Sequence, residues 1–234
     1  MPWVFWKPPI LWDKATAFII GGGPSVLGAD YCLPWEHREA LFTAGKVIGV
    51  NDGYKVDRRI PICFFGDGCW FEWNHQDLNH WPGIVITSAD KFAKQKNRVP
   101  YLKVIPRGKP NGIETKRSRI AFNRSSGPAA INLAYHLGAT RIVLIGFDMR
   151  IVDGQKNFHN HHKSTAKDQG TGYKTNKKDP KALPRFLEPF NAIAHDAKTL
   201  KLEIINSTPD SALKHFLYMP LKEAIEKYVM VNPS

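Results

Sequence analysis

The stretch Ala17-Phe-Ile-Ile-Gly-Gly-Gly-Pro-Ser-Val26 joins an apolar run to three consecutive glycines. Apolar and β-branched residues from Thr16 to Ile20 predict a buried parallel strand. The glycines allow a sharp turn and a close approach by a ligand, because no Cβ is in the way. Pro24 suits the first position of a helix, and Ser25 adds a hydroxyl beside exposed backbone N–H groups. We interpret the stretch as a cradle for phosphate oxygens. The alternative is a tight turn that binds nothing.

Other apolar runs also end in small and polar residues, which is the pattern of strands in a parallel sheet. Val47–Asn51 leads into Asp52, Ile62–Phe65 leads into Asp67 between two glycines, and Ile142–Ile145 leads through Gly146 into Asp148. Because the carboxyl ends of parallel strands meet at one edge, we expect Asn51, Asp67 and the glycine turn to face one crevice. Local hydrogen bonding in a turn is the alternative explanation for Asp67.

Helical spacing alternates with these strands and predicts the fold class. Strands are also expected at Ile84–Thr87 and Leu202–Asn206. We predict an α/β protein with a Rossmann-like, mostly parallel sheet and helices on both faces. Residues 1–15 would form an N-terminal arm, and residues 16–234 a single domain. Within that domain, we expect residues 90–124 to be a basic, lid-like insertion and residues 150–182 a mobile loop rich in histidine and lysine. Helices are expected over Pro34–Ala44, from Trp70, over Ala129–Leu137, from Pro184 and over Pro220–Tyr228.

Composition places the chain among soluble globular proteins. Its 234 residues include 43% hydrophobic residues and three cysteines without metal-type spacing. We therefore expect reduced thiols and a cytoplasmic location. No apolar segment approaches the roughly 18 residues of a membrane span, so no membrane partner is expected. A homo-oligomer is left open.

The formal net charge of +12 is unevenly placed along the chain. Between Lys91 and Arg124 there are eleven cationic residues and one acidic residue, Glu114. A field of this sign favours polyanions such as nucleic acid or nucleotide phosphates. The alternative is a basic surface that serves only solubility.

Two later segments carry further candidate chemistry. Ser125, Ser126 and Gly127 come directly before an alanine-rich helix, where hydroxyl and N–H groups favour anions. His159, His161 and His162 stand within four positions. One of them could serve as a general base or contact a phosphate. The alternatives are ligands for a transition metal and an inert loop.

The ordered series of motifs resembles a known group of proteins. The series comprises Gly-Gly-Gly-Pro-Ser after the first strand, Asn51, Ser126-Gly127, the run Leu137–Asp148, the histidine loop and Asn206–Leu213. It resembles a family encoded in tailed-phage and prophage genomes. More remotely, it is similar to small bacterial sialyltransferases and to the archaeal hydroxymethylpterin pyrophosphokinase-like family.

The sialyltransferase resemblance implies a nucleotide site and a histidine base. By that resemblance, His161 or His162 would deprotonate the acceptor hydroxyl, with His159 behind them. Arg150 stands where those enzymes have a tyrosine that contacts phosphate, and Asp67 stands where they have an asparagine. The implied contacts to the donor nucleotide are Gly22, Gly23, Ser25, Asn51, Ser125, Ser126 and Gly127; we add Pro24, Asp52, Asp148 and Arg150 as candidates from their positions beside these motifs.

Three functions follow from the sequence. The first is a glycosyltransferase that uses a nucleotide-activated sugar and acts on a polyanionic acceptor such as phage DNA, with no metal expected. The second is a pyrophosphoryl transferase that uses ATP and Mg²⁺, for which Asp67 and Asp148 would be the metal-binding pair. The third is a non-catalytic module that binds nucleotides or nucleic acid.

Overall fold

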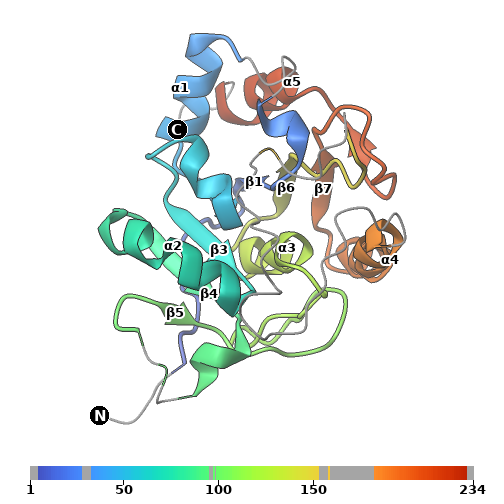
Figure 1. Cartoon of the computed structure of the whole chain (residues 1–234). Helices are drawn as coiled ribbons and strands as arrows, with labels where there is room; N and C mark the ends of the chain where they lie inside the picture. The colour runs from blue at the N-terminus through green and yellow to red at the C-terminus, as the bar shows by residue number, and fades with distance from the viewer. Residues whose placement is uncertain are drawn as a thin grey trace.

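The computed structural model describes residues 5–27, 33–94, 97, 99–152, 158 and 182–230. These residues form an eight-stranded sheet with the order β5-β4-β3-β2-β1-β6-β7-β8 (Figure 1). Every strand pairing in this sheet is parallel. The predicted α/β class with a parallel sheet is therefore confirmed.

The strands and helices agree closely with the sequence pattern, and two short edge strands are additions to it. The strands are β1 (Thr16–Ile20), β2 (Val47–Val50), β3 (Ile62–Phe65), β4 (Ile84–Thr87), β5 (Lys103–Val104), β6 (Arg141–Ile145), β7 (Glu203–Asn206) and β8 (Leu217–Tyr218). The helices are α1 (Trp35–Thr43), α2 (Gly68–His80), α3 (Ser126–His136), α4 (Ala182–Thr199) and α5 (Leu221–Ile225), which continues into a π-helical turn, Glu226–Met230. The sequence pattern did not predict β5 or β8.

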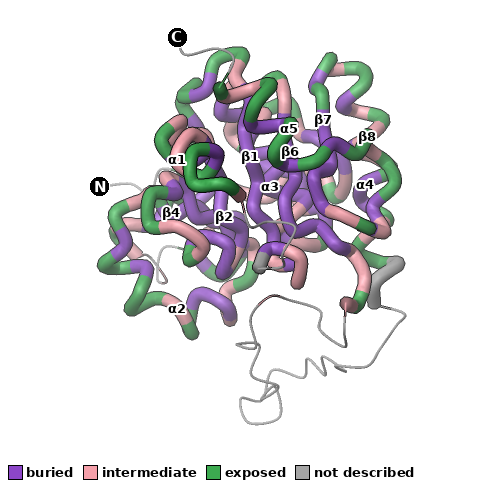
Figure 2. Tube along the Cα trace, turned by 90° about the horizontal axis from the view of Figure 1, so that it is seen from above, coloured by how far each residue is buried: buried purple, intermediate pink, exposed green. Residues whose placement is uncertain are grey.

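Side chains alternate between the two faces of the sheet, and helices cover both. Phe18 and Phe65 belong to a buried cluster with apolar residues of α1, α2 and α5. Ile19 and Phe64 belong to a second cluster with α3 and α4. The central strands are buried along their length, and exposed residues lie on the outer sides of the helices (Figure 2). The apolar runs seen in the sequence arise because these strands are covered on both faces.

The basic stretch between β4 and α3 packs against the domain over residues 99–124. Ile113 and Ile120 are almost completely buried in the α3 side of the core. Asn132 of α3 accepts hydrogen bonds from the backbone N–H groups of Glu114 (2.9 Å) and Ala121 (2.8 Å). Residues 99–124 of the stretch thus pack against α3 in the described structure.

Ion pairs also reduce the exposed charge of this stretch. Four of its cations contact carboxylates elsewhere in the chain: Lys91 with Glu72, Arg107 with Asp90, Lys109 with Asp196, and Arg124 with Glu188. Over the part of the stretch that the structure describes, these four positive charges are compensated, and the support that they lent to a polyanionic acceptor is weaker than the sequence suggested.

The N-terminal arm packs on its own domain where it is described. The backbone N–H of Trp6 donates to the carbonyl of Val104 in β5 (2.9 Å), and that of Trp12 donates to Leu137 after α3 (2.8 Å). The Trp12 side chain is buried in the α3 side of the core. The described part of the arm therefore runs from β5 to the C-terminal end of α3.

Candidate functional site

The strand order reverses at β1, and the candidate site lies there. The chain builds β2 to β5 on one side of β1 and then returns to place β6 on its other side. Open parallel sheets bind ligands at the carboxyl ends of the strands beside such a reversal. The segments that meet at this edge are the glycine turn after β1, Asn51 after β2, Gly66 after β3 and Asp148 after β6.

Glycine is required in the turn after β1 because this turn lies in close contact with the end of β6. The N–H of Gly21 donates to Ile145 (2.7 Å), and the N–H of Gly23 donates to Gly146 (2.9 Å). A Cβ at Gly23 would lie 1.8 Å from Oδ2 of Asp148 and 2.6 Å from the Gly146 carbonyl oxygen. The protein's own backbone and carboxylate therefore explain why Gly23 is a glycine. The turn does not by itself indicate a ligand.

Two of the predicted nucleotide contacts hold each other. The hydroxyl of Ser25 donates to Oδ2 of Asp148 (2.7 Å), and the Ser25 N–H donates to Oδ1 (3.3 Å). Asp148 is only 2% exposed. Burial raises the pKa of its carboxyl group, while the hydrogen bonds from Ser25 act in the opposite direction. This pair fixes the glycine turn to β6 and leaves neither side chain as a simple ligand group.

The N-terminus of α3 lies between the ends of β3 and β6. The hydroxyl oxygen of Ser126 accepts a hydrogen bond from the N–H of Gly66 (3.0 Å). Gly127 lies against Phe147, since a Cβ on Gly127 would be 3.0 Å from that ring. Ser125 is the N-cap residue, but its side chain makes no capping hydrogen bond. The backbone N–H groups in the first turn of this eleven-residue helix carry partial positive charge. In the described structure, the N-cap side chain does not accept a hydrogen bond from them.

Asn51 provides a polar group without a partner at the same edge. It begins a 3₁₀ turn, Asn51–Val56, and has a left-handed backbone with φ of 50°. Its Oδ1 is buried and accepts no hydrogen bond from any described residue. Gly53 of this turn lies against the end of β1, because a Cβ there would be 2.5 Å from the Ile20 carbonyl oxygen. Buried acceptors without partners are rare in folded proteins.

Two predicted site residues instead have structural contacts. Asp52 is 2% exposed and accepts a hydrogen bond from Nε1 of Trp70 (2.7 Å) while pairing with Lys55 (2.8 Å). Asp67 is the N-cap of α2, where its Oδ1 accepts the N–H of Cys69 (2.9 Å). The local explanation for Asp67 fits this geometry, and neither carboxylate is kept in the site that we propose below.

The remaining predicted residues lie around the glycine turn or outside the described residues. Pro24 is half-buried and begins a 3₁₀ turn, Pro24–Leu27. Arg150 follows β6, and its guanidinium lies 3.9 Å from Asp210. The N–H of Phe158 donates to the carbonyl of Gly22 (3.0 Å). The three histidines, His159, His161 and His162, lie outside the described residues.

Arg107 is a residue of this edge that the sequence did not single out. Its Nη2 donates to the carbonyl of Gly66 (2.9 Å), and its guanidinium lies over Phe122, 4.1 Å from the ring centroid. Because the N–H of Gly66 also donates to the Ser126 hydroxyl oxygen, Arg107 places a partly buried cation at the α3 end of the crevice. Nothing in the sequence distinguishes Arg107 from the other cations of the basic stretch.

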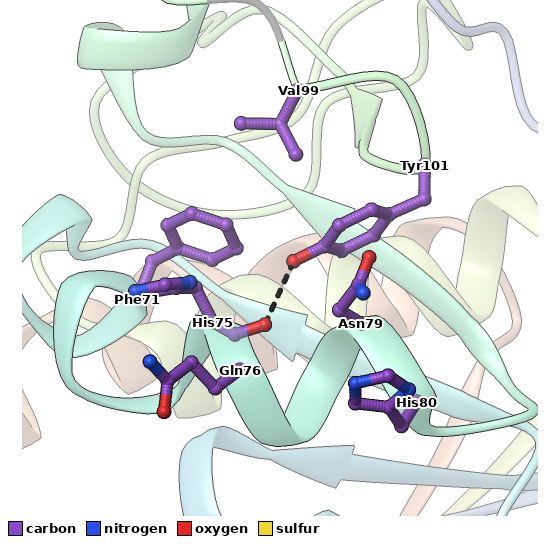
Figure 3. A pocket seen from close by; sticks show the side chains of 7 residues that line it. All are labelled: Phe71, His75, Gln76, Asn79, His80, Val99 and Tyr101. Carbon is purple, nitrogen blue, oxygen red and sulfur yellow. Dashed lines mark hydrogen bonds between the residues drawn. The ribbon is translucent and has the colours of Figure 1, made fainter.

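A surface hollow lies elsewhere on the molecule (Figure 3). It measures about 630 Å³ and lies between α2 and residues 99–101, where the hydroxyl of Tyr101 donates to the carbonyl of His75 (3.1 Å). Because α2 begins at the carboxyl edge, its last turns lie toward the opposite edge of the sheet. The hollow is therefore separate from the candidate site. Its lining residues are Phe71, His75, Gln76, Asn79, His80, Val99 and Tyr101.

Two properties of the described residues bear on partners. None of their helices combines the length and the apolar character that crossing a bilayer requires. Among the same residues there is no group of three or more His, Cys, Asp or Glu side chains arranged to hold a metal ion.

The fold is similar to that of a solved glycosyl-transferring protein. That protein is the sialyltransferase CstII from Campylobacter jejuni, in complex with a substrate analogue, cytidine-5′-monophosphate. The TM-score is 0.52 at 15% sequence identity, and the likeness covers 90% of this chain and 87% of that chain. At this identity the likeness shows the shared α/β fold, and it gives no support to the phage or pterin resemblance. No protein-family model and no curated protein sequence matches the chain.

We expect Gly23→Ala to destabilise the fold by about 2 kcal/mol or more, because its Cβ would overlap the Asp148 carboxylate. Gly68→Ala is the matched control, since a Cβ there meets only the flexible Lys91 side chain at 3.2 Å. Urea unfolding of both variants measures the difference. Equal stability of the two variants would contradict the close packing of the glycine turn against β6.

The burial of Asp148 predicts a pH-dependent effect of Asp148→Asn. The pKa of Asp148 is raised in the folded protein, so its contribution to stability is present at low pH and is lost as the pH rises through that pKa. Because asparagine does not ionise, the variant should gain stability relative to the wild type between about pH 4 and about pH 7. Urea unfolding at both pH values tests this. A difference in stability that is independent of pH would be inconsistent with a buried, ionising Asp148.

Proposed function

We propose that the chain is a glycosyltransferase that binds a nucleotide-activated sugar at the carboxyl ends of β1, β2 and β6. The observation that carries the proposal is the buried, unpartnered Oδ1 of Asn51 beside the glycine turn. It lies at the strand-order reversal of a fold shared with a sialyltransferase solved with cytidine-5′-monophosphate. An acceptor in this position suits an N–H or O–H donor of a nucleoside.

Phosphate groups of the donor would lie toward α3. The first-turn amides of α3 carry partial positive charge, and the side chain of Ser125 does not cap them. Ser126 keeps its hydroxyl proton for donation, because its oxygen accepts from Gly66. Arg107 reaches this end of α3 through its hydrogen bond to the Gly66 carbonyl, and Arg150 follows the end of β6 by five residues. Positive groups so arranged would stabilise the negative charge that develops on a departing nucleotide phosphate.

A histidine after Phe158 is the proposed general base. The N–H of Phe158 bonds to Gly22 in the glycine turn, and His159, His161 and His162 follow it by one, three and four positions in the sequence. An imidazole titrates near neutral pH and can take a proton from an acceptor hydroxyl. We propose His161 or His162 for this role, with His159 as a supporting residue.

The pyrophosphoryl-transfer alternative is not retained. It required Asp67 and Asp148 to hold Mg²⁺ together. Asp67 instead caps α2, and both carboxylate oxygens of Asp148 accept hydrogen bonds from Ser25. Neither carboxylate is thus presented to a shared cation.

Nucleotide binding should raise the melting temperature, and Asn51→Gly should abolish the effect. Glycine removes the amide but tolerates the left-handed backbone at this position. For the wild type at a concentration about 100 times Kd, we expect a rise of about 5 °C or more. The measurement is a thermal-shift screen of nucleoside monophosphates and nucleotide sugars, with Asn191→Ala on the surface of α4 as control. A shift that survives Asn51→Gly would place the nucleotide elsewhere.

Replacing the base should reduce turnover without reducing donor binding. For His161→Ala or His162→Ala we expect the rate of nucleotide-sugar hydrolysis to fall about 10²- to 10⁴-fold. The thermal shift with the donor should stay unchanged in the same variant. Hydrolysis can be followed by release of the free nucleotide, with and without a metal chelator. Full activity in both histidine variants would rule out this assignment of the base.

A further inference from the structure

Five exposed cations and one half-buried cation, Lys46, gather at the edge of the sheet opposite the candidate site. In a parallel sheet, residues just before each strand lie at its amino-terminal edge. Lys14 comes before β1, Lys46 before β2, and Lys198 and Lys201 come before β7. We call this set, together with Lys116 and Arg119 beside the C-terminal end of α3, the amino-edge face.

The position of the last two cations follows from a hydrogen bond to α3. His136 in the last turn of α3 contacts the carbonyl of Arg119 through Nε2 (2.7 Å), and the Arg119 N–H donates to the carbonyl of Lys116. Among the described residues, no cation of the amino-edge face forms an ion pair. The acids on the same side are Asp13, which is exposed, Glu114, whose Oε1 accepts the backbone N–H of Lys116 (3.1 Å), and Glu203, which is paired with Arg141. The face therefore has an uncompensated positive charge.

Two aliphatic side chains stand exposed beside these cations. Ile10 is 58% exposed and Leu11 is 48% exposed. Both are held in place, because the N–H groups of Leu11 (3.0 Å) and Trp12 (2.8 Å) share the Leu137 carbonyl and Lys14 bonds to Gly138. The backbone of Ile10 and Leu11 is thus fixed against the end of α3, while about half of each residue stays exposed. Among the residues that the structure describes, none covers the exposed part of either side chain.

We propose that the amino-edge face binds the surface of an anionic lipid bilayer. Cations attract anionic headgroups, and adjacent aliphatic side chains gain by entering the headgroup–acyl boundary. Nucleic acid would use the same cations, but it gains little from isoleucine and leucine, since bases are bound by stacking on aromatic or guanidinium planes. The combination of charge with aliphatic groups favours lipid. This proposal revises the sequence-based expectation of no membrane partner, which considered only spanning segments.

Such binding would leave the candidate site accessible. The sheet separates the amino-edge face from the glycine turn by the length of β1, which is about 16 Å for five residues. A bilayer at one edge would therefore leave the carboxyl edge facing away from the lipid. The proposal does not depend on the proposed function, because lipid binding needs no nucleotide sugar.

Sedimentation with sucrose-loaded vesicles tests the proposal. One set of vesicles contains phosphatidylcholine alone, and the other contains equal parts of phosphatidylcholine and phosphatidylglycerol. We expect the full chain to sediment with the anionic vesicles only, and to be released as the NaCl concentration rises. The double substitution Ile10→Ser and Leu11→Ser should weaken binding to anionic vesicles about tenfold or more.

Matched control substitutions distinguish binding by the amino-edge face from a general effect of removing charged or apolar side chains. Leu217→Ser with Tyr218→Ser removes exposed apolar groups from β8 and should not change binding. Lys116→Glu with Lys198→Glu should weaken binding about tenfold or more, whereas Lys94→Glu with Lys214→Glu, which follow the carboxyl ends of β4 and β7, should weaken it far less.

Three results would overturn the proposal. The first is no sedimentation with anionic vesicles at low salt. The second is equal weakening by the test and control pairs. The third is the absence of vesicle binding together with salt-sensitive binding to duplex DNA that the double substitution Ile10→Ser and Leu11→Ser leaves unchanged. This result would assign the amino-edge face to nucleic acid.

Discussion

The contact between the glycine turn and the end of β6 is the constraint on which the candidate site depends. Gly23 donates to Gly146, and Ser25 donates twice to the buried carboxylate of Asp148. The loop after β7 supports the same strand end, since Thr208 accepts the N–H of Phe147 (2.9 Å). These bonds close the β1–β6 side of the crevice and leave its other side to Asn51 and the N-terminus of α3. Rigid walls of this kind let a ligand bind without first ordering the chain.

Most of the fold could be predicted because the central strands are buried on both faces. Such strands appear in the sequence as short apolar runs, and the runs of β3 and β4 were predicted with their observed bounds. The edge strands β5 and β8 have only two residues each; Lys103 and both residues of β8 are exposed and only Val104 is buried, so neither strand leaves an apolar run to recognise. The many cations of the basic stretch suggested an exposed segment, but its isoleucines Ile113 and Ile120 are buried against α3. The periodicity of apolar residues predicts which elements are buried. It cannot predict burial in segments where only single residues enter the core.

The candidate site was predicted only in part. From the sequence, the glycine turn, Asn51 and Asp67 were expected at one edge, and the parallel sheet has all three at the carboxyl ends of its strands. The roles of Asp52 and Asp148 could not be read from the sequence, whereas the local hydrogen bond of Asp67 was one of the two explanations that the sequence offered. Asp52 pairs with Trp70 and Lys55, Asp67 caps a helix, and Asp148 binds Ser25, and each of these partners is set by tertiary packing or by the local turn. Arg107 was missed for the same reason.

Hydrogen exchange measured by mass spectrometry, with and without cytidine-5′-monophosphate, tests the central claim most directly. If the nucleotide binds at the strand-order reversal, peptides that contain the glycine turn, Asn51–Val56 and the first turn of α3 should all exchange more slowly with it bound. Peptides from the last turns of α2 and from residues 99–101 should not change. Protection confined to that hollow, or no protection at any saturating nucleotide, would contradict a nucleotide site at the carboxyl ends of β1, β2 and β6.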